Sequence, residues 1–181
     1  AFGQGSLRCN TSGCFNTASG AAALAANTTG CENTAVGKDA MLATTTGIRN
    51  VAIGKGALKT NTTGDANVAI GREALGVATT ADNNTSVGFD SLTANTTGDN
   101  NVAVGMNTML ANTTGVNNTA IGQGALRCNT TANENTVVGM NALRVNTTGA
   151  FNTVVGKNSL VTNTTGQKNT SIGFEAGYNI T

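Results

Sequence analysis

The amino-acid sequence predicts an all-β fold: a parallel β-solenoid of about ten and a half 17-residue coils, forming one domain over residues 1–181. Three observations lead to this prediction. One motif recurs every 17 residues without an insertion or deletion. That period is too short for two-helix repeats, which take about 33 to 47 residues. The repeated residues, rich in Thr, Asn and Gly, form helices poorly and include short alternating segments typical of strands.

The repeat reads Asn-Thr/Val-Ala-Val/Ile-Gly-x-x-Ala-Leu-x-x-Asn-Thr-Thr-Gly-x-x, and we number its positions 1 to 17 from the first Asn. The Asn-Thr-Thr-Gly segment is typical of a turn. Stacking in a solenoid brings identical positions into columns about 4.8 Å apart. A partial copy covers residues 1–15, and the last copy, residues 169–181, is atypical because Gly177 replaces leucine. The copies begin at Asn16, Asn33, Asn50, Asn67, Asn84, Asn101, Asn118, Asn135, Asn152 and Asn169.

Alternation along the first strand places repeat positions 2 and 4 on one face and positions 1, 3 and 5 on the other. Because position 4 is almost always Val or Ile, we expect its face to point inward. A second strand is expected from position 9, with positions 9, 11 and 13 inward and positions 10, 12 and 14 outward. The glycines at positions 5 and 15 are expected at corners with a positive φ. The expected core columns are Val36, Ile53, Ile70, Val87, Val104, Ile121, Val138, Val155 and Ile172, together with Leu24, Met41, Leu58, Leu75, Leu92, Met109, Leu126, Leu143 and Leu160.

So thin an interior predicts self-association. Burial of about 4–6 kcal/mol per coil faces the ordering entropy of 17 residues, so an isolated rod would be marginal. Repeat position 3, outward in this interpretation, is small and suits close approach by another chain, most simply in a trimer. The alternative is that small residues merely fit a crowded corner. The expected self-association column is Ala18, Ala35, Ala52, Ala69, Ala103 and Ala120.

Composition argues against several functions. The formal net charge is only +1, whereas nucleic-acid binding needs a dense set of Lys and Arg. No apolar run approaches the roughly 20 residues of a membrane-spanning helix. The chain has no His and nine acidic residues, so it offers little for catalysis, and we expect neither enzymatic activity nor a cofactor.

Residues at position 16 suggest a disulfide and a metal site. Cys14 and Cys31 share this position on successive coils, close enough for a disulfide in an oxidising location, although two free thiols are the alternative. Asp65, Asp82 and Asp99 form an acidic column at the same position, a weak candidate for Ca²⁺ against the alternative of solvated carboxylates.

Asn-x-Ser/Thr triplets recur at position 12, which this interpretation places outward. In a host that glycosylates Asn they predict a sugar on every coil or two. The alternative is that the segment is simply a good turn. The candidate sites are Asn10, Asn27, Asn61, Asn95, Asn112, Asn129, Asn146 and Asn163.

The motifs resemble known families over essentially the whole chain. Residues 118–131 are similar to the repeats of phage and bacterial tail-fibre-type proteins, which often precede an intramolecular chaperone domain. The Val-Ala-Ile-Gly runs at 51–54 and 68–71 resemble the β-roll heads of trimeric autotransporter adhesins, although those heads have a shorter period. The resemblance implies a left-handed, trimeric fibre shaft, located extracellularly, at a cell surface or on a virion.

The leading functional hypothesis is therefore a structural shaft segment of a fibre or filament whose partner is itself. An adhesin or receptor-binding head, with a cell-surface receptor or glycans as partner, is the first alternative. Exposed aromatic residues, which sugar binding usually needs, are few, chiefly Phe15, Phe89, Phe151 and Phe174. A glycosylated fibril core and an ice-binding solenoid are further alternatives. Ice binding is disfavoured because adjacent threonines at positions 13 and 14 face opposite sides.

Overall fold

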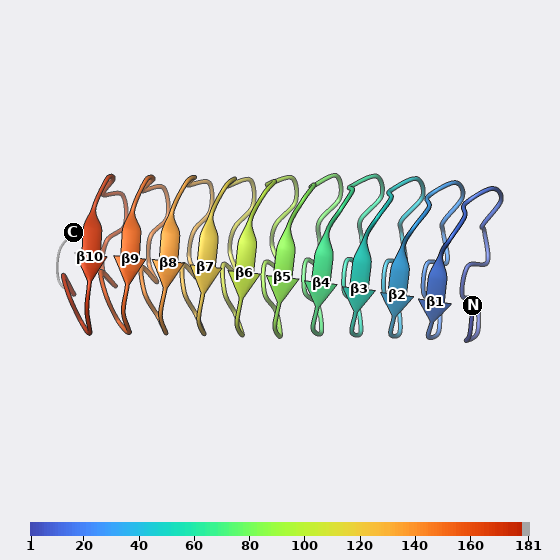
Figure 1. The fold of residues 1–181 in the computed structure, drawn as a ribbon, viewed down its shortest axis with the longest axis horizontal. Coiled ribbons are helices and arrows are strands. Elements are labelled where there is room, and N and C mark those ends of the chain that lie inside the picture. Colours follow the sequence, from blue (N-terminus) through green and yellow to red (C-terminus); the bar gives the residue numbers. More distant parts are fainter. Residues whose placement is uncertain (179–181) are drawn as a thin grey trace.

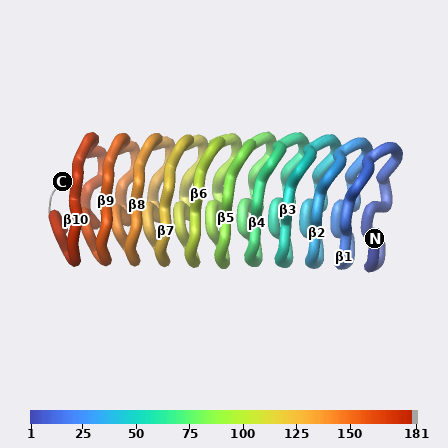
Figure 2. The backbone as a smooth tube through the Cα atoms, viewed as in Figure 1, coloured from blue at the N-terminus to red at the C-terminus, as the bar shows by residue number. Residues whose placement is uncertain are grey.

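Every complete copy of the repeat contributes one short strand in the computed structural model, which describes residues 1–178. The strands form one parallel sheet in sequence order, and the coils stack into a rod with the chain ends at opposite ends (Figures 1 and 2). The predicted β-solenoid with a 17-residue repeat is thereby confirmed. The strands are β1 (Thr17–Ser19), β2 (Thr34–Val36), β3 (Val51–Ile53), β4 (Val68–Ile70), β5 (Thr85–Val87), β6 (Val102–Val104), β7 (Thr119–Ile121), β8 (Thr136–Val138), β9 (Thr153–Val155) and β10 (Thr170–Ile172).

Strand register follows the repeat throughout. Ala52 on β3 lies opposite Ala35 on β2 and Ala69 on β4, one repeat away in each direction. Backbone bonds join successive coils: the Val51 N–H donates to the Asn67 carbonyl at 2.8 Å, and the Gly54 N–H donates to the Val36 carbonyl at 2.8 Å. Each coil therefore satisfies the polar backbone of its neighbours, as in other repeat architectures.

The two faces of the strand are the reverse of the prediction. Alanine at position 3 is completely buried, as at Ala35 and Ala52, whereas the neighbouring Val36 and Ile53 at position 4 are exposed. The opposite wall already places leucine in the interior, so position 3 holds a side chain no larger than valine: alanine or serine in most copies, and valine at Val137 and Val154. The position-4 column Val36, Ile53, Ile70, Val87, Val104, Ile121, Val138, Val155 and Ile172 was therefore wrongly assigned to the core.

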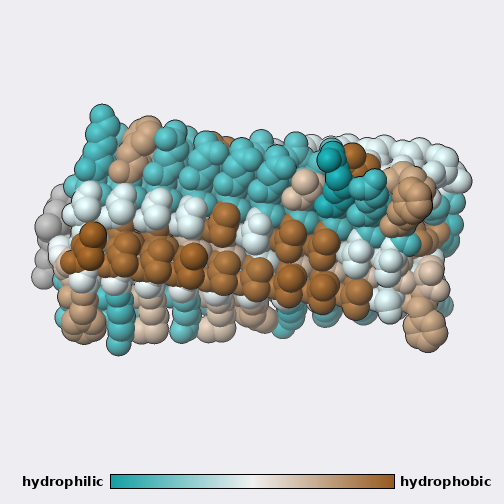
Figure 3. All heavy atoms as spheres, viewed as in Figure 1, coloured by the Kyte–Doolittle hydropathy of each residue, from teal (hydrophilic) through white to brown (hydrophobic). Residues whose placement is uncertain are grey.

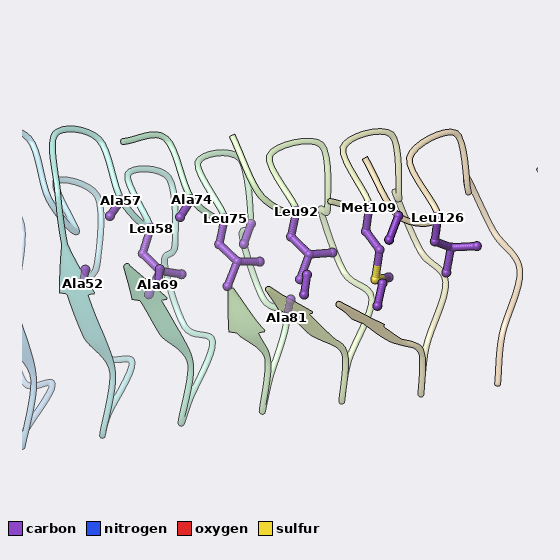
Figure 4. Close-up of a cluster of buried hydrophobic side chains, with 14 of the residues drawn as sticks. Ala52, Ala57, Leu58, Ala69, Ala74, Leu75, Ala81, Leu92, Met109 and Leu126 are labelled. Carbon is purple, nitrogen blue, oxygen red and sulfur yellow. The ribbon is translucent and has the colours of Figure 1, made fainter. Parts of the chain in front are cut away.

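The core is a single file of leucine and methionine enclosed by alanine. Leu58, Leu75 and Leu92 are fully buried, and Figure 4 shows such side chains in a row between the two walls, beside small residues such as Ala57 and Ala69. Position 9 is buried in every copy from Leu24 to Leu160, as predicted. Alanine packing against a central leucine gives a thin but dry interior.

The predicted second strand does not form. Position 9 adopts a left-handed conformation, with φ of 49° at Leu58 and 50° at Leu75, and the chain turns there instead of running straight. Leucine seldom accepts this φ, so its burial must offset about 1 kcal/mol of strain in each coil. The turn changes which side chains face inward: position 12 is buried, and position 11 is partly or fully exposed, for example at Val77.

The glycines at the two corners differ in backbone conformation. Position 5 has the expected positive φ, 133° at Gly54 and 136° at Gly88. Position 15 does not, and Ala81 and Ala132 take its place in two copies. The prediction of a positive φ at position 15 was wrong, because this corner is held by side-chain amides instead.

Candidate functional site: the outer face of the sheet

Repeat positions 2 and 4 of every strand point away from the core and form a surface that we call the sheet face. Its position-4 column is exposed by 37–41% at Val36, Ile53, Ile70, Ile121 and Val155. Figure 3 shows this column as a continuous apolar band along the rod. The sheet face consists of Thr17, Thr34, Val51, Val68, Thr85, Val102, Thr119, Thr136, Thr153 and Thr170 at position 2, and of Ser19, Val36, Ile53, Ile70, Val87, Val104, Ile121, Val138, Val155 and Ile172 at position 4.

The sheet face is regular and uncharged. Its two columns hold only Thr, Ser, Val and Ile. Strand spacing repeats them about every 4.8 Å, over a length of about 43 Å. A contiguous exposed apolar band of this size, rimmed by polar residues, is typical of an interaction surface.

One border of the sheet face carries charged and aromatic side chains at position 6. Arg72 lies over the ring of Phe89 at 5.3 Å from its centroid, and Lys157 lies over Phe174 at 5.8 Å. Each pair joins one coil to the next, so this border is stabilised along the rod. It is more irregular than the sheet face, because each coil presents a different residue.

The alanine column predicted for self-association lies inside the solenoid. Ala35, Ala52, Ala69, Ala103 and Ala120 are completely inaccessible to solvent, and Ala18 is nearly so. Because alternation puts position 3 opposite positions 2 and 4, the reversal that buries alanine exposes Val and Ile. The contact surface predicted at the alanine column was therefore wrong.

The predicted glycosylation column is also buried, with the exception of Asn10, which is exposed. Asn27, Asn61, Asn95, Asn112, Asn129, Asn146 and Asn163 are at most 1% exposed. In this column the Asn112 Nδ2 donates to Asn95 Oδ1 at 2.8 Å and to the Gly115 carbonyl at 3.1 Å. A saccharide on these amides would require the coil to open, so the outward orientation predicted for position 12 was wrong.

A second amide ladder, at position 1, was not predicted from the sequence. Asn101 Oδ1 accepts the Asn118 N–H at 3.0 Å and its Nδ2–H at 3.2 Å, while Asn101 Nδ2 donates to Asn84 Oδ1 and to the Gly115 carbonyl. The signal was present, because position 1 is Asn in all ten copies whereas position 2 varies between Thr and Val. Invariance at a polar position and variation beside it indicate which of the two is buried.

The carboxylates of the acidic column at position 16 accept hydrogen bonds from backbone N–H groups. Asp65 Oδ1 accepts the Ile48 N–H at 2.8 Å, and Asp82 and Asp99 repeat the contact with the preceding coils. Asn133 takes the same role toward Val116. Within residues 1–178 no group of three or more potential ligands is placed to hold a metal ion, so the geometry gives the Ca²⁺ hypothesis no support.

The two cysteines predicted to pair do lie together. Cys14 Sγ and Cys31 Sγ are 2.6 Å apart, and both are free thiols. The hydrogen bond with Cys31 raises the pKa of the Cys14 thiol above its ordinary value. The other two cysteines, Cys9 and Cys128, occupy position 11, where they are exposed and half-buried respectively.

The position-12 ladder is interrupted at Thr44, which leads to a stability prediction. Asn27 Oδ1 and Thr44 Oγ1 are buried and have no hydrogen-bond partner. The substitution Thr44→Asn would supply an amide that donates to Asn27 and extends the ladder toward Asn61. We expect it to raise the free energy of unfolding by about 1–2 kcal/mol, measured by denaturant unfolding.

The control for this substitution is Thr44→Val, which removes the orphan hydroxyl without supplying an amide. It should recover only part of the gain, because Asn27 Oδ1 stays unpaired. A Thr44→Asn protein no more stable than Thr44→Val would contradict the role assigned to the ladder.

Comparison with known proteins provides no relative: no family model, no curated protein and no solved structure matches the chain. No pocket is found among residues 1–178. Over the same residues, no helix has the length and apolar character to cross a membrane.

Proposed function

We propose that this chain is a structural shaft segment of an extracellular or virion fibre, and that it self-associates through the sheet face. The exposed apolar band of Val and Ile is the observation that carries the proposal. Soluble monomers seldom leave such a band uncovered along their full length.

A second copy of the chain is the partner that fits the sheet face best. The band repeats about every 4.8 Å, and an identical rod presents ridges and grooves with the same spacing. No charged residue lies on either column, so approach requires no ion pairing and no burial of unpaired charge. Because the band is narrow, three rods can place their bands around one axis, which favours a trimer.

The solenoid itself favours a structural role. Its coils contact only their neighbours, so length can be added without redesigning the fold. The sheet face is nearly uniform along the rod, whereas a receptor-binding head would be expected to concentrate distinctive side chains at one place. The resemblance to tail-fibre-type repeats supports the extracellular or virion location.

The test is the oligomeric state of a charged variant. Ile53→Glu/Ile121→Glu places two carboxylates on the sheet face, and we expect it to convert the assembly into monomers in sedimentation equilibrium while circular dichroism stays unchanged. Both side chains are about 40% exposed, so the substitution leaves the core intact. Burying the added carboxylates unpaired in an interface would cost several kcal/mol each.

The matched control is Thr63→Glu/Thr131→Glu, which adds the same charge to the same coils at exposed position 14. It should assemble like the unaltered protein. An unaltered chain that sediments as a monomer at micromolar concentration would overturn the proposal. In that case, measurable thermal hysteresis would indicate that the flat array of Thr and Val binds ice. Binding to a glycan array would instead indicate an adhesin.

A further inference from the structure

We propose that Cys14 and Cys31 form a reversible disulfide that fastens two successive coils of the solenoid together. Their sulfur atoms already lie 2.6 Å apart as thiols. They occupy the same repeat position on neighbouring coils, where column spacing is about 4.8 Å, inside the Cα separation that disulfides span. Closing the bond needs only a small movement of the two side chains.

The fold itself aims the Cys31 sulfur at its partner. Cys31 Sγ accepts the Cys14 N–H at 3.0 Å. Farther along the same column, Asp65 Oδ1 and Asn133 Oδ1 accept the N–H of the preceding coil in the same way. Cys31 therefore occupies a repeat position whose side chain accepts a backbone N–H from the preceding coil. This contact directs its sulfur toward Cys14.

The pair is accessible and selective. Cys14 is exposed and Cys31 is half-buried, so a small oxidant can reach them. Cys9 and Cys128 lie in a different column and, counted along the repeat, seven coils from each other. Because the Cys14 pKa is raised, less of this thiol is ionised at neutral pH, and oxidation should quicken as the pH rises.

The redox step needs a disulfide oxidant such as oxidised glutathione. One cysteine thiolate attacks it, forming a mixed disulfide and releasing one glutathione thiolate. The second cysteine thiolate then attacks the protein-bound sulfur and releases the other glutathione. The two cysteines lose two protons and two electrons, and the oxidant becomes two molecules of reduced glutathione.

The bond would restrict opening of the coil between the two cysteines, residues 15–30. That coil is held to the next one by backbone bonds that include Leu24 N–H to the Ala40 carbonyl at 3.0 Å and Thr28 N–H to the Thr45 carbonyl at 2.9 Å. The disulfide closes a ring one coil long. By chain-entropy reasoning, closure on this scale makes opening about a hundredfold rarer.

The experiment uses the full chain with Cys9→Ser and Cys128→Ser, so that only the proposed pair can react. The protein is treated with oxidised glutathione, or with dithiothreitol as the reduced reference, and then alkylated for mass spectrometry. We expect the mass of a single chain lowered by two hydrogens, with no alkylating agent taken up. Hydrogen exchange at Leu24 and Thr28 should slow by about a hundredfold in the oxidised protein.

The matched control adds Cys31→Ser, which removes the partner and should give only the glutathione adduct of Cys14. A parent protein that keeps two alkylatable thiols, stops at the glutathione adduct or crosslinks between chains would overturn the disulfide. A bond that forms but leaves exchange at Leu24 and Thr28 unchanged would overturn its role in fastening the coils.

Discussion

Replacing Gly88 with alanine should destabilise the solenoid by more than about 4 kcal/mol, or prevent it from folding. Gly88 has a φ of 136°, a conformation that residues with a side chain rarely adopt. A Cβ atom there would lie 2.5 Å from the Gly105 carbonyl oxygen and 2.6 Å from the Gly105 carbonyl carbon. Backbone hydrogen bonds hold both glycines in place, because the Gly88 N–H donates to the Ile70 carbonyl and the Gly105 N–H donates to the Val87 carbonyl, both at 2.7 Å. The backbone strain of the positive φ and the steric clash of the Cβ therefore add.

The matched control is Gly56→Asn, which changes another glycine with positive φ. Gly56 has a φ of 68°, and the atoms that a Cβ would meet there belong to the flexible carboxylate of Glu73. Asn141 occupies the same repeat position with a φ of 53°, so asparagine is accepted there. Denaturant unfolding should show a small change for Gly56→Asn. A Gly88→Ala protein within about 1 kcal/mol of the parent would contradict the argument, by the usual size of single-site effects.

The repeat period was sufficient to predict the architecture. A parallel stack demands that each residue pair with the residue one repeat away, and the strand pairs have that register, as between Val51 and Val68. The leucine column could also be predicted, because Leu or Met recurs at position 9 in every copy from Leu24 to Leu160. Both inferences depend only on stacking.

The orientation of the strand could not be predicted by hydrophobicity. Alternation tells which residues share a face and leaves open which face is inside, and a slip of one residue reverses every assignment. Val and Ile at position 4 looked like the core, yet the interior takes Ala52 and Asn50, both fully buried. Polar Asn can occupy the inside because each amide is satisfied by the next coil and by a turn carbonyl.

The sheet face could not be predicted for the same reason. When position 4 is assigned to the core, no apolar band is expected on the surface, and the alanine column is left as the expected association surface. The prediction of a second strand was wrong for a different reason. The left-handed φ of Leu75 breaks the alternation from which position 12 was expected to point outward. No local propensity predicts leucine in that conformation, because only burial in the stacked assembly stabilises it.

Replacing Asn101 with alanine should destabilise the solenoid by about 4 kcal/mol or more, since the substitution removes a buried hydrogen-bonding group. Asn101 is fully buried, and its side chain donates to Asn84 Oδ1 at 3.2 Å and to the Gly115 carbonyl at 2.8 Å. Its Oδ1 accepts two N–H groups of Asn118. Alanine would leave several buried polar groups unpaired, at about 1–3 kcal/mol each.

The neighbouring residue provides the control, because Asn100→Ala makes the same chemical change at an exposed position. Asn100 has a φ of 57°, and Ala66 accepts 55° at the same repeat position, so alanine is tolerated there. Unfolding should separate the two variants by at least about 3 kcal/mol. Equal stabilities would mean that the amide ladder contributes no more than solvent does, and the solenoid would then owe its stability to the leucine column and the backbone ladder alone.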